Sequence, residues 1–277
     1  MSVRPYAEVI GDPIAHSKSP LIHNFWLEKL GIDAEYRACH VRPDELADYF
    51  ARRRGDALWR GCNVTIPHKV SVLEFVDVST GVAIAVGAAN TVVRSPDGRL
   101  SATNTDVDGV AAALIGLDLT GQDVCVLGAG GAARAAFHEL AQLRCWVLGW
   151  ARDPEKAVAV GRDCGGAVVG VPFVKGSTAL SGAALFINAT QLGMAGQVEM
   201  PQFVRDELGQ MDPDGSVFDM VYHPQETRLL ASAKSLGLRT IDGLTMLIGQ
   251  AASAFEMFFG QPAPREHDAE LRALLTG

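Results

Sequence analysis

The sequence has few of the features that indicate a disulfide-bonded protein, a metalloprotein or a membrane protein. Its five cysteines are odd in number, widely scattered and form no C-x-x-C pair, so we expect reduced thiols. The seven histidines include no H-E-x-x-H pair, and we therefore expect no bound metal. No apolar run reaches the roughly 18 residues that a membrane-spanning helix needs.

An excess of positive charge is also lacking, because the formal net charge is −8. The chain therefore has no basic field to attract nucleic acid or an anionic membrane. Its first eight residues lack the apolar segment of a secretory signal, so we expect a cytoplasmic protein. With 277 residues, of which 48% are hydrophobic and 20% are charged, the chain can bury one large core or two smaller ones. A monomer and a homodimer are both compatible with these observations.

Strand-like and helix-like segments alternate through the first hundred residues, which predicts an α/β region. The spacing of Leu21, Phe25 and Leu30 indicates a helix, and Gly31 gives its end. Short apolar or β-branched runs between turn residues indicate the strands. The expected strands cover residues 6–10, 35–41, 61–66 and 91–93, and the expected helices cover residues 20–30 and 42–54.

The pattern becomes more regular after Asp118. The continuously apolar run Val124–Leu127 is typical of a strand that is buried on both faces. A glycine-rich turn, a helical stretch at residues 134–142 and a second apolar run at 145–148 follow it. Later apolar runs cover residues 183–188 and 216–220, and a last helix is expected at 244–259. This order predicts βαβ units in a parallel, right-handed sheet.

The turn after the first buried strand reads Gly128-x-Gly130-x-x-Ala133. Small residues at these positions allow a tight turn, a close approach of pyrophosphate to the backbone and close packing of helix on strand. The following helix offers free N–H groups and a positive dipole end to phosphates. Because the strand and helix context is present, we expect a dinucleotide cradle rather than a merely structural turn. Its expected cofactor-binding residues are Gly128, Ala129, Gly130, Gly131, Ala132 and Ala133.

The end of the second strand decides the choice of cofactor. An NAD enzyme usually has an acidic residue there for the ribose hydroxyls. This chain has Arg152 instead, with Lys156 one helical turn later, and two cations suit a 2′-phosphate. The carboxylate of Asp153 could repel that phosphate. The plainer interpretation of the segment is a solvated loop that leads into a helix. We expect NADP, with NAD as the alternative.

Five polar clusters remain, and their order along the chain resembles that of the shikimate dehydrogenase family over nearly the whole sequence. The clusters are Ser17–Pro20, Gly61–Lys69, Gly87–Thr91, Asn104–Asp106 and Asp242–Gln250. The resemblance implies reversible, NADPH-dependent reduction of 3-dehydroshikimate to shikimate in aromatic amino acid biosynthesis. It also implies that Lys69 and Asp106 are the catalytic pair. That role suits the chemistry, because reduction of a carbonyl needs a proton donor and a positive charge beside its oxygen.

The resemblance assigns the other site residues as well. Serine hydroxyls would bind the substrate carboxylate, and amide side chains would bind ring hydroxyls, since an amide offers both donors and an acceptor. The plainer alternatives are a helix cap for the serines and turn formation for the asparagines. The implied substrate-binding residues are Ser17, Ser19, Asn63, Thr65, Asn90, Tyr222 and Gln250. The implied residues near the nicotinamide are Asn188, Ala189, Thr190, Gly243 and Met246.

We therefore expect two α/β domains with the active site in the cleft between them. Residues 1–105 would form the substrate-binding domain, residues 106–242 a Rossmann-type NAD(P)-binding domain, and residues 243–277 helices that pack back on the first domain. The family's NADP-reading segment begins Asn-Arg-Thr, whereas this chain has Ala151-Arg152-Asp153, so strict NADP preference stays open. The alternatives are a quinate or quinate/shikimate dehydrogenase that uses NAD, and a non-catalytic NAD(P)-sensing protein.

Overall fold

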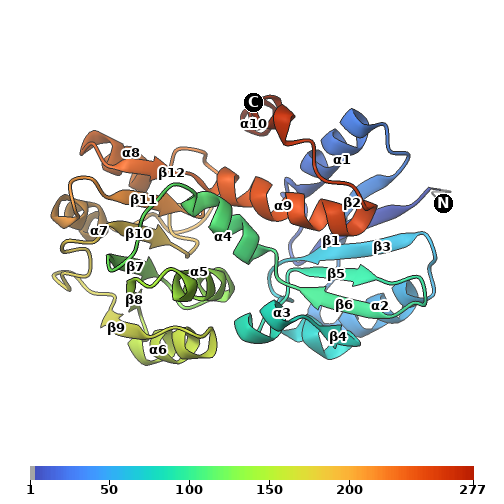
Figure 1. Ribbon diagram of the computed structural model, residues 1–277, viewed down its shortest axis with the longest axis horizontal. Helices are drawn as coiled ribbons and strands as arrows, with labels where there is room; N and C mark the ends of the chain where they lie inside the picture. The colour runs from blue at the N-terminus through green and yellow to red at the C-terminus, as the bar shows by residue number, and fades with distance from the viewer. Residues whose placement is uncertain (1–3) are drawn as a thin grey trace. The chain divides into compact units, whose positions relative to one another are not determined.

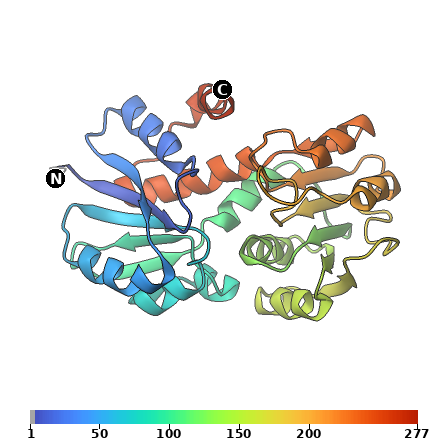
Figure 2. The same cartoon turned by 180° about the vertical axis from the view of Figure 1, so that it is seen from behind.

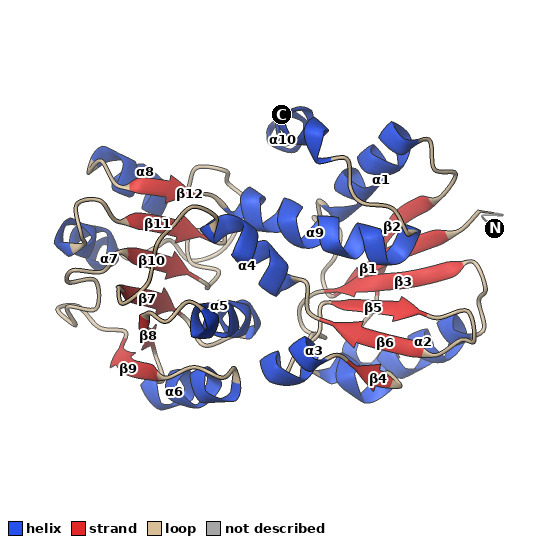
Figure 3. Ribbon diagram, viewed as in Figure 1, coloured by secondary structure: helices blue, strands red, loops and turns tan. Residues whose placement is uncertain are grey.

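The computed structural model describes residues 4–277, which fold into two compact α/β units. The first unit contains the chain up to Thr105 together with Gln250–Gly277, and the second contains Asp106–Gly249. Each unit is built around its own sheet (Figures 1 and 3). No helix in the described part of the chain is long and apolar enough to cross a membrane.

The sheet of the first unit is mixed, with the strand order β2-β1-β3-β5-β6-β4. Strand β1 pairs in parallel with β2 and β3, whereas β5 runs antiparallel to both β3 and β6. Since β1, β2 and β3 are parallel, their carboxyl ends lie at one edge of the sheet. The strands are β1 (Tyr6–Gly11), β2 (Glu35–His40), β3 (Trp59–Val64), β4 (Val78–Ser79), β5 (Thr91–Arg94) and β6 (Leu100–Thr103).

Helices cover both faces of this sheet with aromatic side chains. On one face Trp26 of α1 contacts Phe255 of α9, with ring centroids 5.5 Å apart. On the other face Phe50 of α2 packs against Trp59 of β3, with centroids 6.5 Å apart. The helices are α1 (Ser19–Leu30), α2 (Leu46–Arg54), α3 (Gly81–Val86), α10 (Asp268–Thr276) and the later part of α9 (Gly243–Phe259), with short 3-10 turns at Pro43–Glu45, Ser71–Phe75 and Arg265–His267.

The sheet of the second unit is entirely parallel, with the strand order β12-β11-β10-β7-β8-β9. Such a sheet, with its first strand at the centre, is the doubly wound dinucleotide-binding arrangement, which confirms the predicted fold class. Helices lie on both of its faces (Figures 1 and 2). The strands are β7 (Asp123–Leu127), β8 (Trp146–Ala151), β9 (Val168–Pro172), β10 (Leu185–Asn188), β11 (Ser216–Asp219) and β12 (Arg239–Ile241). The helices are α4 (Asp106–Leu114), α5 (Gly131–Gln142), α6 (Pro154–Asp163), α7 (Gln202–Glu207), α8 (Arg228–Ser235) and the first part of α9, with a 3-10 turn at Leu208–Gln210.

Two of the predicted elements have different ends in the structure, and both lie next to prolines. The helix expected at 42–54 begins as a 3-10 turn at Pro43–Glu45 and becomes α-helical only from Leu46. The strand expected at 61–66 covers Trp59–Val64, and Thr65 and Ile66 continue only as single backbone hydrogen bonds to Ile10 and Asp12 before Pro67, which has no N–H. Both corrections lie at the ends of elements and leave the order of elements unchanged.

Candidate functional site

The predicted cofactor-binding residues gather at the carboxyl edge of the second sheet. They follow β7, β8, β10 and β12, which are all parallel, so the loops after these strands share one edge. In open α/β sheets ligands bind outside this edge, where the strand order reverses. The reversal here lies between β7 and β10, beside the glycine-rich turn.

The glycine-rich turn has the geometry of a phosphate cradle. Gly128 has φ +117°, and a Cβ atom there would lie 3.0 Å from Cγ2 of Thr190. Gly130 is the N-cap of α5, and a Cβ atom on it would meet no atom within 4 Å. Ala133 is completely buried in the first turns of α5. The turn therefore leaves open space at the helix N-terminus, where free backbone N–H groups can bind a pyrophosphate.

Substitution of Gly130 by alanine should weaken cofactor binding without disturbing the fold. The added methyl group enters open space in the free protein, at the place where a pyrophosphate would approach the backbone. We expect the Kd for NADPH, measured by fluorescence titration, to rise about tenfold or more, with an unchanged Tm. Gly209→Ala, also into open space but away from the cradle, is the control. An unchanged Kd in Gly130→Ala would contradict this account of the cradle.

The end of β8 lies next to the cradle, because the N–H of Gly128 donates to the carbonyl of Trp150 over 2.9 Å. Arg152 and Lys156 follow this strand with exposed side chains. Asp153 caps α6, and its Oδ1 accepts the N–H of Lys156 at 3.0 Å. One oxygen of the Asp153 carboxylate, which could repel a 2′-phosphate, is thus used in a helix cap.

A buried carboxylate connects the carboxyl ends of β10 and β11. Oδ1 of Asp219 accepts hydrogen bonds from Nδ2 of Asn188 (2.9 Å) and from the N–H of Val221 (3.1 Å), and Oδ2 accepts one from the Thr227 hydroxyl (2.6 Å). Asn188 Oδ1 in turn accepts the hydroxyl of Thr190 at 2.7 Å. The sequence prediction missed Asp219 and Thr227, although Asp219 is the last residue of a buried strand.

Asp219 should make the stability of the protein depend on pH. Burial raises the pKa of its carboxyl from 3.8 to about 6. Its favourable contribution is therefore complete below pH 3.8, where the carboxyl is protonated in both states, and is lost as the pH rises through about 6. Asp219→Asn, which is uncharged throughout, should lack this dependence. We expect the wild-type free energy of unfolding, relative to that of the variant, to fall by about 2 kcal/mol between pH 4 and pH 7.

Urea unfolding at a series of pH values measures this difference. Asp214→Asn, at an exposed aspartate of the same unit, is the control and should run parallel to the wild type. Parallel curves for the wild type and Asp219→Asn would show that the carboxyl is not penalised by burial.

Three further predicted residues lie near the ends of β11 and β12. Tyr222 is half-buried, and burial raises the pKa of its phenol, which therefore keeps its proton at neutral pH. Gly243 begins α9, where a Cβ atom would lie 2.5 Å from the carbonyl oxygen of Met220. Only a glycine lets the helix begin this close to the end of β11. Met246 is buried one turn later.

The predicted amides of the first unit form one hydrogen-bonded network. Asn63, at the end of β3, donates from Nδ2 to Oγ1 of Thr91 at 3.0 Å. The Thr91 hydroxyl lies 3.0 Å from Oδ1 of Asn90, and Nδ2 of Asn90 lies 3.4 Å from Oε1 of Gln250. The backbone N–H of Thr105 also donates to Oδ1 of Asn90, at 2.7 Å. All five residues are buried, so the structure joins Asn63, Asn90 and Gln250 from distant parts of the sequence.

The predicted serines and Thr65 lie in loops at the carboxyl ends of β1 and β3. Ser17 accepts the N–H of Ser19 on its Oγ at 3.3 Å, and Ser19 begins α1 as a buried residue. Thr65 follows β3, and its N–H donates to the carbonyl of Ile10 at 2.9 Å. Since β1 and β3 are parallel neighbours, these hydroxyl groups come from adjacent loops at one edge of the sheet.

Hydrogen bonds link both predicted catalytic residues to the segment Ala89-Asn90, Lys69 through its own carbonyl and Asp106 through the residue before it. The carbonyl of Lys69 accepts the N–H of Ala89 at 2.7 Å, and Asp106 follows Thr105, whose N–H binds Asn90. Lys69 is half-buried, and Asp106 is a buried residue at the start of α4. His68 is buried with Nε2 2.7 Å from the carbonyl oxygen of Val41, an arrangement that suits a structural side chain.

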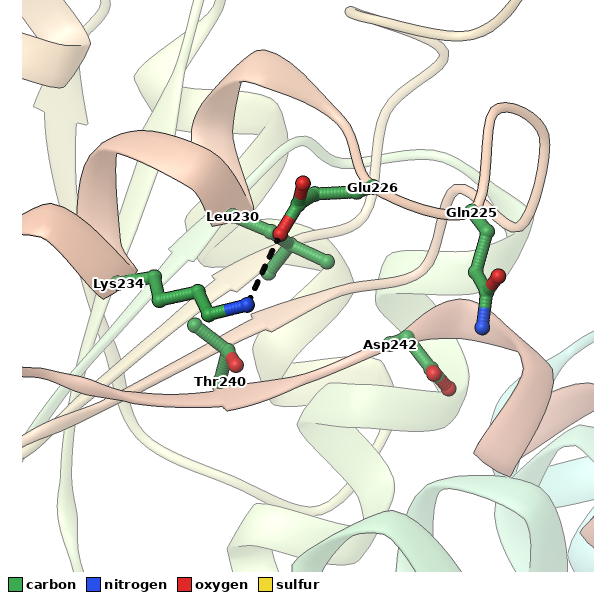
Figure 4. Close-up of a pocket in the computed structure, with 6 residues that line it drawn as sticks. All are labelled: Gln225, Glu226, Leu230, Lys234, Thr240 and Asp242. Atoms are coloured by element: carbon green, nitrogen blue, oxygen red, sulfur yellow. Dashed lines mark hydrogen bonds and ion pairs between the residues drawn. The ribbon is translucent and has the colours of Figure 1, made fainter.

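A hollow of about 350 Å³ lies in the second unit, beside α8 and β12 (Figure 4). Apart from Leu230 its side chains are polar, and Lys234 and Glu226 are paired at 3.5 Å. It contains none of the predicted site residues, and its lining consists of Gln225, Glu226, Leu230, Lys234, Thr240 and Asp242. Within residues 4–277, no group of three His, Cys, Asp or Glu side chains could hold a metal ion.

The strand order and the glycine-rich turn define the second unit as a Rossmann-type fold, and comparisons with known proteins identify the family. The model of the shikimate dehydrogenase substrate binding domain matches residues 9–92, and that of the shikimate 5′-dehydrogenase C-terminal domain matches residues 243–270. A protein named shikimate dehydrogenase (NADP+) from Sphingopyxis alaskensis is 50% identical over 275 residues, which cover 98% of this chain and 97% of that protein. The chain belongs to the shikimate dehydrogenase family.

Solved structures agree with this assignment. The crystal structure of a shikimate dehydrogenase in complex with NADP+ is similar with a TM-score of 0.88 and 32% identity, covering 99% of this chain and 96% of that chain. Shikimate 5-dehydrogenase from Thermus thermophilus, in complex with NADP(H) and shikimate, is similar with a TM-score of 0.84 and 33% identity, covering 98% of this chain and 99% of that chain.

Proposed function

We propose that this protein is a shikimate dehydrogenase that reversibly reduces 3-dehydroshikimate to shikimate with NADPH. The observation that carries the proposal is the 50% identity, over 275 residues, with a protein named shikimate dehydrogenase (NADP+). The open glycine-rich cradle and the buried amide network supply the two kinds of site that such a reaction needs. A cytoplasmic location and a lack of nucleic acid and membrane partners stay predictions from the sequence.

In this proposal the first unit binds the substrate. The hydroxyls of Ser17 and Ser19 bind its carboxylate, whereas the side chains of Asn63, Asn90 and Gln250 bind ring hydroxyls, with Thr65 as a further contact. Tyr222, a residue of the second unit, is also proposed to contact the substrate. A polar cluster of this kind selects a ligand with many hydroxyl groups, because an analogue that lacks one leaves a buried donor or acceptor without a partner.

The second unit binds the cofactor. Backbone N–H groups at Gly130 and Gly131 hold the pyrophosphate, and Arg152 with Lys156 holds the 2′-phosphate. The segment Asn188–Thr190, together with Gly243 and Met246, lines the nicotinamide. When bound, NADPH supplies the hydride that reduces the ring ketone.

Lys69 and Asp106 act on the ketone oxygen. As the carbonyl is reduced, negative charge develops on this oxygen, and Nζ of Lys69 stabilises the charge and donates a proton to it. Asp106 holds the lysine and accepts a hydrogen bond from a neighbouring ring hydroxyl. In the reverse direction Lys69 accepts the proton of the alcohol.

Arg152 should determine the choice between NADP and NAD. Its removal costs a charge-assisted hydrogen bond to the 2′-phosphate, so we expect Arg152→Ala to raise the Kd for NADPH about 10- to 100-fold. The Kd for NADH, which has no such phosphate, should stay within about twofold. Arg162→Ala, at the other end of α6, is the control. An equal change for both cofactors would remove Arg152 from phosphate recognition.

Initial rates with shikimate and with quinate, each paired with NADP and with NAD, test the proposed function. Preference for shikimate with NADP is the expected result. Preference for quinate or for NAD would make the protein the quinate-type relative. Cofactor binding without turnover in any combination would make it a sensor.

A further inference from the structure

Two buried hydroxyl groups join the amides of the first unit, and neither was predicted as a site residue. Tyr36 and Thr91 have exposed fractions of 1% and 0%. The hydroxyl of Tyr36 lies 2.6 Å from Oδ1 of Asn63. Oγ1 of Thr91 lies 3.0 Å from Nδ2 of Asn63 and 3.0 Å from Oδ1 of Asn90. Within residues 4–277, these two hydroxyls are the side-chain hydrogen-bond partners of Asn63.

A backbone carbonyl fixes the orientation of the Asn63 amide. The oxygen and nitrogen ends of an amide have nearly the same shape, so the partners decide which end points where. The carbonyl of Asn90 can only accept, and it lies 3.3 Å from Nδ2 of Asn63. The opposite end is therefore the oxygen, and Tyr36 donates to it. Burial raises the pKa of the Tyr36 phenol, which keeps the proton for this bond.

A backbone N–H fixes the Asn90 amide in the same way. The N–H of Thr105 can only donate, and it lies 2.7 Å from the Asn90 atom that must therefore be Oδ1. The amide nitrogen of Asn90 then points toward Oγ1 of Thr105, at 3.0 Å, and toward Oε1 of Gln250, at 3.4 Å. The side chain of Gln250 consequently turns its oxygen to Asn90.

The Thr91 hydroxyl connects the two fixed amides. It accepts from Asn63, so its single proton is donated elsewhere, and Oδ1 of Asn90 at 3.0 Å is a nearer acceptor than Oγ1 of Thr105 at 3.2 Å. Donation then runs in one direction, from Tyr36 through Asn63, Thr91 and Asn90. Removal of the Thr91 hydroxyl leaves an amide N–H of Asn63 without its acceptor in a buried place, and such a group reorients to find another partner.

We propose that the hydroxyls of Thr91 and Tyr36 are positioning groups that hold the Asn63 and Asn90 amides in the orientation that binds the substrate. This inference rests on the proposed function, in which these amides bind ring hydroxyls. Neither hydroxyl touches the substrate in the proposal. Both act through the orientation of the amides that do.

Steady-state kinetics of Thr91→Val, with shikimate and NADP as substrates, test the inference. Valine has nearly the shape of threonine without its hydroxyl group. We expect KM for shikimate to rise roughly tenfold and KM for NADP to stay within about twofold, with kcat reduced less. Thr91→Ser, which restores the hydroxyl, should return KM for shikimate to within about threefold of the wild type.

Thr103→Val is the matched control, because Thr103 pairs with Thr91 across β5 and β6 while its hydroxyl bonds to Thr80. It should keep the wild-type KM for shikimate. An unchanged KM in Thr91→Val, or an equal loss in Thr91→Ser or Thr103→Val, would overturn the inference. If Thr91→Val does not fold, Tyr36→Phe, which keeps the ring stacked 3.9 Å from His23, decides by the same criteria. A wild type that does not oxidise shikimate would refute the proposed function before any variant is compared.

Discussion

Lys69→Ala should lower kcat for shikimate oxidation about a thousandfold, because general acid–base catalysis by one side chain contributes about 10²- to 10⁴-fold. In the proposed mechanism Lys69 supplies both the proton and the positive charge at the ketone oxygen, and water replaces it poorly. The substrate is held chiefly by Ser17, Ser19 and the amide network, which this substitution leaves in place. We therefore expect KM for shikimate to change much less than kcat.

The control for this experiment is Lys175→Ala, at an exposed lysine of the second unit. Its kinetics should match those of the wild type. Equal Tm values for Lys69→Ala and the wild type would show that the lost turnover is not lost folding. A Lys69→Ala variant with near-normal kcat would remove Lys69 from the mechanism.

Glu8→Ala should destabilise the first unit by about 3 kcal/mol or more, since the loss of one partner from a buried ion pair leaves the others uncompensated. Glu8 lies in β1 with an exposed fraction of 1%. Its carboxylate accepts from Arg53 at 2.8 and 3.0 Å, from Arg37 at 3.0 Å and from the Tyr49 hydroxyl at 2.8 Å. The substitution leaves the buried hydroxyl and both guanidinium groups without this acceptor.

Urea unfolding of Glu8→Ala and of Glu270→Ala measures this effect. Glu270 also forms an ion pair, with Lys29 at 2.7 Å, but its side chain is 52% exposed. Exposed pairs contribute about 1 kcal/mol or less, so Glu270→Ala should change stability little. Equal losses in the two variants would show that the buried network around Glu8 adds nothing beyond a surface pair.

The parts of the fold that could be predicted from the sequence are those with local signals. Val124–Leu127 is an uninterrupted apolar strand, and Gly128 and Gly130 follow it at once, so strand, turn and helix were all evident. The parallel sheet followed from repetition of this unit. The short strands β4 and β12 have no such signal, and pairing with their neighbours in the sheet defines them.

The sequence indicates which residue types the candidate site contains, but it does not indicate which of them are in contact. Asn90 and Gln250 are 160 positions apart, and only the folded chain brings their amides together. Asp219 was missed because a carboxylate at the end of a strand is common, and its bond to Thr227 forms across a loop. Thr91 was missed because a threonine at the start of a strand has an ordinary structural explanation, its β-propensity.

The measurement that tests the central claim most directly is oxidation of NADPH on addition of 3-dehydroshikimate to the purified protein, followed by absorbance, with the product identified by chromatography. The account predicts one equivalent of shikimate for each NADPH consumed, at a rate that Lys69→Ala lowers about a thousandfold. A protein that binds NADPH but consumes none of it with this substrate would contradict the account.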